Sequence, residues 1–182
     1  MCRDYGLPQE REWSRAFQAV AIAALGNLDE GIAQLTDSLA LQKAMGAGLV
    51  RSAFLAMLAD LYRIAGWTEE GMRAIEEGFL YAEESGERGY LAELHRAKAE
   101  LQRLMNDEAG AEASFHAAMD HARSQEAKLF ELRAATGCAR LLAQRGRTPE
   151  ARALLTPIYS WFSEALGTAD IAAARELLDR MR

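Results

Sequence analysis

Apolar and small residues recur along the chain at helical spacing, and the same arrangement returns with a 40-residue period. The two most similar stretches begin at Gly26 and at Gly66, and the same offset leads on to Asn106 and Gly146. Glycine and asparagine readily adopt the left-handed conformation that ends a helix. The pattern therefore predicts four copies of one helical unit, each with a helix end near its centre.

Several columns of similar residues recur at this offset and indicate how the two helices of a unit pack. Two columns contain small residues and one contains large apolar residues. They are Ala19, Ala59, Ala99 and Ala139; Gly31, Gly71, Ala111 and Ala151; and Leu35, Ile75, Phe115 and Leu155. Two helices of a hairpin approach closely only where one of them carries a small residue, and a large residue on the other helix fills the remaining space. The columns therefore predict tightly packed helix pairs.

Each copy is interpreted as two antiparallel helices, A and B, which gives an all-α fold of about four helix hairpins in a single domain over 1–182. In the second copy we expect helix A over 49–65 and helix B over 68–85. Thr68 and Thr148 are expected to cap the second helices of their copies. The copies span approximately 8–46, 47–86, 87–126 and 127–166, and a C-terminal capping helix over 168–181 covers the last one.

The helix columns resemble the tetratricopeptide (TPR) repeat family. The second copy supplies Leu58-Ala59 and Tyr62 on helix A, then Gly71 and Ile75 on helix B. The 40-residue period departs from the family's usual period of about 34, so both helices must be longer than is usual. The resemblance implies a right-handed superhelix of hairpins that binds a protein or peptide in the groove lined by the A helices.

Longer stretches are similar to a narrower group, the C-terminal TPR region of large bacterial signalling proteins. These stretches are 89–100, 131–142, 146–162 and 168–170. In that group the region follows a class III adenylate/guanylate cyclase-like or DNA-binding domain and a P-loop ATPase module. The resemblance implies a regulatory role in signal transduction. It carries over no catalytic residue, because the GxxxxGK[ST] loop of an ATPase does not occur in this sequence.

The composition of the chain argues against several classes of function. The chain has a formal net charge of −6, which argues against direct nucleic-acid binding. It has no apolar run long enough to cross a membrane. Its two cysteines, Cys2 and Cys138, form no CxxC pair, which favours free thiols and a cytoplasmic location.

The residues that could carry chemistry form no catalytic or metal-binding pattern. His116 and His121 are five positions apart and point away from each other on a helix, and His95 lies on helix A of the third copy. Cys138 falls in a packed column, where a buried structural thiol is expected rather than a nucleophile. We therefore expect no metal, no cofactor and no enzyme activity.

The repeat register predicts which side chains line the groove. The candidate residues are Trp13, Val20, Asp60, Arg63, Glu93, Arg96, Glu100, Arg103, Arg133 and Arg140. The first copy offers an apolar, aromatic surface and the later copies offer several arginines, which suit carboxylates. The expected partner is a protein or peptide with an acidic part and an apolar part. Three alternatives stay open: a ligand- or peptide-sensing domain, a homodimerisation module, and groove charges that pair with one another, as Glu100 would with Arg140.

Overall fold

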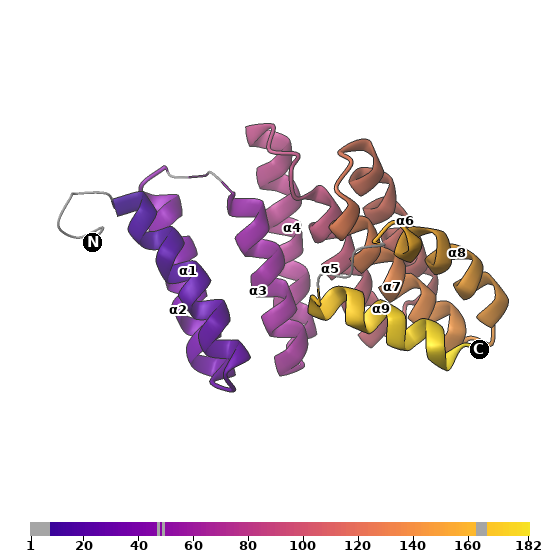
Figure 1. Ribbon diagram of the computed structural model, residues 1–182. Coiled ribbons are helices and arrows are strands. Elements are labelled where there is room, and N and C mark those ends of the chain that lie inside the picture. The colour runs from indigo at the N-terminus through magenta and orange to yellow at the C-terminus, as the bar shows by residue number, and fades with distance from the viewer. Residues whose placement is uncertain (1–7, 47, 49, 163–166) are drawn as a thin grey trace. The chain divides into compact units, whose positions relative to one another are not determined.

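The computed structural model describes residues 8–46, 48, 50–162 and 167–182. Within these residues the chain is all-α, and consecutive helices form antiparallel pairs (Figure 1). The helices are α1 (Pro8–Ala24), α2 (Leu28–Ala44), α3 (Arg51–Ala65), α4 (Thr68–Ser85), α5 (Leu91–Leu104), α6 (Glu108–Ser124), α7 (Lys128–Gln144), α8 (Thr148–Ser160) and α9 (Ala169–Arg180). The predicted hairpins and C-terminal helix are confirmed.

Contacts between residues divide the chain into two compact units, Met1–Tyr90 and Leu91–Arg182. Unit 1 holds the hairpins α1–α2 and α3–α4, with α2 packed against α3. Unit 2 holds the hairpins α5–α6 and α7–α8, with α6 packed against α7. The last helix, α9, packs against both α7 and α8. None of the helices in the described part of the chain combines the length and apolar character that crossing a membrane requires.

The predicted helix-ending column has the expected backbone. Gly26, Gly66, Asn106 and Gly146 all have positive φ angles, of 102°, 79°, 61° and 76°. Each lies in the turn between the two helices of its hairpin. Left-handed backbone is accessible to glycine and, among other residues, most readily to asparagine. The repeat period therefore reflects a conformational requirement at the centre of every hairpin.

The predicted caps at Thr68 and Thr148 are wrong by one position. Both threonines are the first residues of their helices, and the N-cap positions belong to Trp67 and Arg147, which form no capping hydrogen bond through their side chains. In the third hairpin the same column holds Asp107, whose carboxylate accepts a hydrogen bond from the Gly110 N–H at 2.9 Å. The turn leaves only one residue between the left-handed position and the next helix, so that residue is the cap.

The small and large columns form the packed centre of each hairpin. Ala19, Ala59, Ala99 and Ala139 are all completely buried. The large column is buried to the same degree, with exposed fractions of 0–1% at Leu35, Ile75, Phe115 and Leu155. Close approach at the small column lets the large side chain of the facing helix reach the core. The hydrophobic pattern therefore predicted the core correctly.

A second left-handed column connects one hairpin to the next and was missed by the sequence analysis. Gly46 and Gly86 have φ angles of 66° and 75°, and Glu126, one repeat period after Gly86, has a φ of 55°. A non-glycine residue pays an energetic penalty in this conformation because its Cβ approaches the backbone. Glu126 is thus the strained member of a column that otherwise suits glycine.

Replacing Glu126 with glycine is expected to raise the free energy of unfolding by about 1 kcal/mol, because relief of the left-handed strain exceeds the added freedom of the unfolded chain. Urea denaturation followed by far-UV circular dichroism measures the change. The reverse substitution, Gly86→Glu, serves as the matched control and should lower stability by a similar amount. Equal stability of Glu126→Gly and the wild type would contradict the strain.

The helix α9 takes the position that the first helix of a fifth copy would occupy. Met181 lies one repeat period after Leu141, and both side chains join the buried core of unit 2. Three α9 side chains are buried there as well: Ile171, Ala174 and Leu177. At the positions equivalent to the buried Ala135 and Ala139, however, α9 carries the exposed Arg175 and Asp179. On α9, polar residues thus replace the small apolar residues against which the second helix of a hairpin would pack, as expected for a capping helix.

Candidate functional site

We call the predicted groove side chains of each unit, together with their neighbours on the odd-numbered helices, its A face. In unit 2 the A face is built around Glu93 of α5. Its Oε2 atom accepts a hydrogen bond from Arg96 Nε at 3.1 Å and lies 2.6 Å from Arg133 Nη1 of α7. Arg133 Nε is also 3.6 Å from the Asp170 carboxylate of α9. These ion pairs connect all three odd-numbered helices of unit 2.

Glu100 repeats the arrangement two turns further along α5. Its Oε2 accepts a hydrogen bond from Arg103 Nε at 3.1 Å, and its Oε1 lies 3.6 Å from Arg140 Nη1. The predicted alternative, in which Glu100 pairs with Arg140, therefore occurs. All six candidate residues of unit 2 lie close together, which the repeat register anticipated.

Burial determines which of these charged side chains a partner can reach. Glu93, Arg96 and Glu100 are only 7–8% exposed. Arg133 and Arg140 remain accessible, with 31% and 37% of their side chains exposed. The predicted basic groove is therefore largely neutralised by its own carboxylates, because each acid on α5 stands between an arginine of α5 and an arginine of α7. The two arginines of α7 are the most exposed members of these sets, followed by Arg103 at 25%.

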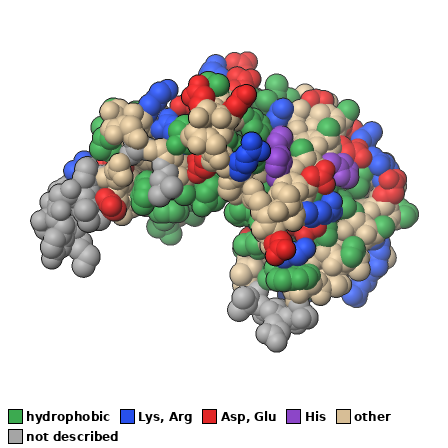
Figure 2. Space-filling model, turned by 90° about the horizontal axis from the view of Figure 1, so that it is seen from above, with side chains coloured by type: hydrophobic (Ala, Val, Ile, Leu, Met, Phe, Trp, Pro, Cys, Tyr) green, Lys and Arg blue, Asp and Glu red, His purple; other side chains and the backbone are tan. Residues whose placement is uncertain are grey.

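The A face of unit 1 is apolar. Trp13 and Val20 are half-buried on α1, while Asp60 and Arg63 on α3 form an ion pair with each other at 3.4 Å. Phe17 lies between Trp13 and Val20 along α1 and is 57% exposed. Figure 2 shows hydrophobic side chains gathered on one face of unit 1. The predicted aromatic surface is present, and its most exposed ring is one that the repeat register did not select.

Phe17 is exposed because another phenylalanine occupies the space beneath it. Its ring packs edge-on against the buried Phe54 of α3, with the centroids 5.2 Å apart. The equivalent residues of unit 2, Ala97 and Ala134, are both 1% exposed. The spacing of Trp13, Phe17 and Val20, four and then three residues apart, was the available signal, since side chains at this spacing share a helix face.

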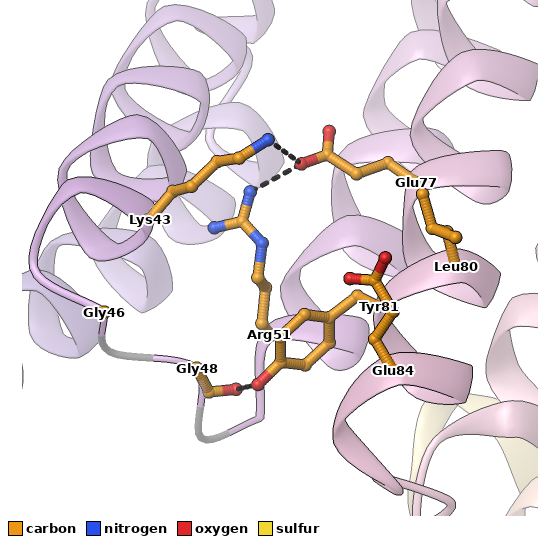
Figure 3. A pocket seen from close by; sticks show the side chains of 8 residues that line it. All are labelled: Lys43, Gly46, Gly48, Arg51, Glu77, Leu80, Tyr81 and Glu84. Atoms are coloured by element: carbon orange, nitrogen blue, oxygen red, sulfur yellow. Dashed lines mark hydrogen bonds and ion pairs between the residues drawn. The ribbon is translucent and has the colours of Figure 1, made fainter.

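A cavity of about 240 Å³ lies in unit 1 where α2, α3 and α4 meet (Figure 3). The buried guanidinium of Arg51 donates hydrogen bonds to the Leu39 carbonyl oxygen and to Glu77 Oε1, both at 2.7 Å. Lys43 Nζ is 3.5 Å from the same Glu77 oxygen. Burial acts to raise the pKa of Glu77, but the hydrogen bond and charge of Arg51, helped by Lys43, lower it overall. Both cations that line the cavity thus serve to fasten the first hairpin to the second.

Comparison with known proteins agrees with this architecture. Two crystal structures of kinesin light chain TPR-like repeats from Podosopora anserina, one of them of a substituted variant, superimpose with a TM-score of 0.71 over 96% of this chain and 85–86% of theirs. The fold is TPR-like. Sequence identity to these structures is 17%, so the likeness concerns the fold alone.

Sequence comparison finds a distant relative in Rhizobium meliloti (strain 1021). The chain is 32% identical over 122 residues to an uncharacterized protein of that organism, a match that covers 66% of the chain and 12% of the relative. The TPR-like chain thus corresponds to a small part of a much longer protein. No known protein family's sequence profile matches the chain.

Two histidines of the TPR-like unit 2 lie together although they are far apart in the sequence. The rings of His95 on α5 and His121 on α6 stack with centroids 5.1 Å apart and an interplanar angle of 14°. Burial, then the nearby His121 and Lys98, lower the pKa of His95 to about 4. Sequence spacing gave no sign of this pair because its members come from different helices.

Lowering the pH from 6.5 to 4 is expected to cost about 2 kcal/mol of stability through His95, allowing for the partial exposure of its ring. The folded protein resists protonation of this ring until about pH 4, whereas the unfolded chain takes up the proton near pH 6.5. The stabilisation is therefore complete above pH 6.5 and disappears as the pH falls toward 4. Urea denaturation at several pH values measures it. His95→Asn should flatten the dependence, and the exposed His116→Asn should not; equal slopes would refute this origin.

The thiol of Cys138 is buried in α7, as the column pattern predicted. Burial, followed by the charge of Glu112, raises its pKa to about 11, so the thiol stays protonated at neutral pH. A protonated, inaccessible thiol is a poor nucleophile, which supports a structural role. The other predicted thiol, Cys2, lies outside the described residues. Among the residues described, no three His, Cys, Asp or Glu side chains are placed to hold a metal ion.

Proposed function

We propose that the chain is a non-catalytic module that binds a protein or peptide on its A faces, as a scaffold or regulatory part of a bacterial signalling protein. The observation that carries the proposal is the 57% exposure of Phe17 on the A face of unit 1. Trp13 and Val20, one turn away on either side, extend the apolar area. Aromatic side chains on accessible faces are the usual anchors of protein interfaces, because covering them removes much apolar area from water.

The A face of unit 2 supports an acidic segment in the partner. Four arginines stand there beside the carboxylates of Glu93, Glu100 and Asp170. Arg133 and Arg140 are the most accessible members, and a guanidinium has five N–H donors, more than these ion pairs use. A partner with an apolar segment and an acidic segment therefore complements the two faces.

The assignment to signalling is supported by the sequence resemblance, and the length of a relative supports a module within a larger chain. The chain matches only 12% of a long Rhizobium meliloti protein, as expected for a module within a larger chain. Its sequence resembles the C-terminal TPR region of cyclase-like and ATPase signalling proteins. TPR-like arrays present large surfaces for partners, so a role in regulating a neighbouring domain or a separate protein fits both observations.

Binding of peptides selected from a phage-displayed library tests the proposal. Phe17→Ala is expected to weaken the selected peptides about tenfold, because a truncated aromatic anchor typically costs more than about 1 kcal/mol. Fluorescence anisotropy of labelled peptides gives the dissociation constants. Leu25→Ala is the matched control, since Leu25 is 84% exposed but lies at the turn after α1, away from the A face.

Three outcomes of these measurements would contradict the proposal or its binding surface. Dissociation constants that are unchanged in Phe17→Ala, or that rise equally in Leu25→Ala, would show that the A face of unit 1 is not the binding surface. Failure of the library to yield any peptide that binds the wild-type chain would contradict the proposed function itself.

A further inference from the structure

The cavity of about 240 Å³ in unit 1 carries charges of both signs in its walls (Figure 3). Lys43 of α2 and Arg51 of α3 provide the positive charges, and Glu77 and Glu84 of α4 provide the negative ones. Figure 3 shows the Arg51 guanidinium and the Glu84 carboxylate directed toward the same space from opposite walls. Sites for drug-sized ligands usually have volumes of roughly 300–1,000 Å³, so this smaller cavity suits one small molecule rather than a peptide.

The positive end of the cavity has unused hydrogen-bond donors. Lys43 Nζ and Arg51 Nη2 approach the same oxygen, Glu77 Oε1, so two cations share one carboxylate. The Lys43 distance of 3.5 Å exceeds the roughly 2.7–2.9 Å of a charge-assisted hydrogen bond, and 73% of this side chain is exposed. Arg51 donates to Leu39 and Glu77, whereas a guanidinium has five N–H groups. A carboxylate of a ligand therefore finds donors on both residues.

The negative end of the cavity is formed by Glu84, which is exposed. Within the described part of the chain, no residue forms a hydrogen bond or an ion pair with its carboxylate. Tyr81, almost one turn earlier on α4, is held in place because its hydroxyl donates a hydrogen bond to the Gly48 carbonyl oxygen at 2.6 Å. A Cβ atom at Gly48 would overlap with Tyr81. An ammonium group of a ligand would give Glu84 the partner that it lacks, beside a fixed aromatic ring.

Leu80 gives the cavity an accessible apolar wall. Its side chain is 56% exposed, and the half-buried ring of Tyr81 lies next to it in the lining. In the other three copies the same position holds Ala40, Asp120 and Ser160, which are small or polar. The large apolar residue thus occurs in the copy whose helix lines the cavity, and an apolar group of a ligand that covered it would gain free energy of burial.

The equivalent place in unit 2 shows that the packing of neighbouring hairpins does not require these charges. Two repeat periods after Lys43 and Arg51 stand Arg123 and Glu131, whose side chains pair directly at 2.8 Å. The position of Glu77 is occupied by Pro157. One basic and one acidic residue thus connect α6 to α7, whereas unit 1 places two cations and two carboxylates around a cavity. The additional charges of unit 1 are therefore available for recognition of a ligand.

Charge balance decides which kind of ligand fits. Residues 1–90 contain 8 Lys and Arg against 14 Asp and Glu, so unit 1 as a whole repels an anion. A ligand with only a positive charge would meet Lys43 and Arg51 in the same cavity. A zwitterion is neutral overall and presents a carboxylate to the positive end and an ammonium group to the negative end. The cavity therefore suits a small zwitterion that also carries an apolar group.

We propose that this cavity binds a free α-amino acid with an apolar side chain. The carboxylate of the amino acid lies between Lys43 and Arg51, and its ammonium group pairs with Glu84. Its side chain covers Leu80 and the ring of Tyr81. This assignment gives the chain a small-molecule site and does not depend on the proposed binding of a protein or peptide to the A faces.

Isothermal titration calorimetry of the full chain with L-leucine, L-methionine and L-phenylalanine tests the proposal. For the amino acid that binds most tightly, the N-acetyl derivative removes the ammonium charge and the primary amide removes the carboxylate. Each derivative should bind at least about tenfold more weakly than the free amino acid, because hydrogen bonds between charged groups are lost.

Substitutions at exposed positions locate the binding. Lys43→Gln and Glu84→Gln should each weaken the amino acid about tenfold, and both side chains are exposed, so the fold should tolerate the changes. Glu83→Gln is the matched control, because Glu83 is an exposed neighbour on α4 that lies outside the lining, and it should leave the dissociation constant unchanged. Leu80→Ala should reduce the preference for the large apolar amino acids over L-alanine.

Several results would overturn the assignment. Absence of binding by all three amino acids would remove the site altogether. Equal affinity for the free amino acid and its N-acetyl derivative would mean that no carboxylate recognises the ammonium group, and equal affinity for the amide would exclude the role of Lys43 and Arg51. Equal effects of Glu83→Gln and Glu84→Gln would place the binding outside this cavity.

Discussion

Replacing Phe115 with alanine is expected to lower the free energy of unfolding by about 4 kcal/mol, the middle of the range for a large aromatic side chain removed from a core. Phe115 is completely buried at the centre of the core of unit 2. Its ring lies against Gly137 of α7, where a Cβ atom would overlap with two ring carbons. Because Gly137 has no side chain that could move into the vacated space, the cavity would stay open.

Chemical denaturation of Phe115→Ala measures this loss, and Phe17→Ala provides the same truncation at a ring that is 57% exposed. The control should lose about 1 kcal/mol, mainly the edge-on contact with Phe54. Gly137→Ala gives a second check. It should destabilise the wild type through the overlap with Phe115, and it should stabilise Phe115→Ala by filling part of the cavity and favouring the helix. Additive effects of the two substitutions would refute this packing.

Replacing Gly31 with valine is expected to cost about 3 kcal/mol, because added atoms in a tightly packed site force the surrounding structure apart. A Cβ atom on Gly31 of α2 would lie 2.7 Å from the Ala19 carbonyl oxygen and 2.7 Å from the Ala23 Cβ of α1. Both atoms belong to, or are fixed by, the α1 backbone, so no side-chain rotation can relieve the overlap. The two helices would have to separate and uncover Leu35.

Thermal and urea unfolding of Gly31→Val measure the cost. Gly89→Val is the matched control, because a Cβ atom at Gly89 meets no atom within 4 Å, and its stability should change by less than about 0.5 kcal/mol. If Gly31→Val unfolds at the same urea concentration as the wild type, the close approach of α1 and α2 inferred from the small columns is wrong.

The A faces could be predicted only in part. The register located Glu93, Glu100 and their arginine partners on the neighbouring helix, since it depends only on the helical period. It could not tell that Arg96 is buried while Arg140 is accessible, because exposure depends on how closely α5 and α7 pack. The register also assigned a fixed set of helix positions to the groove, and Phe17 is not among them. Its counterparts in unit 2 are small.

The sequence by itself determined the number of hairpins, the helix end at the centre of each hairpin and the core of this protein. Every copy needs a left-handed residue at the centre of its hairpin, which is the column from Gly26 to Gly146. Every copy also needs a large buried side chain, which is the column from Leu35 to Leu155. The tertiary structure alone decided which charges are neutralised, which aromatic ring faces solvent and which histidines meet. Those outcomes depend on contacts between different helices, where distances of a few ångströms set both burial and the strength of an ion pair.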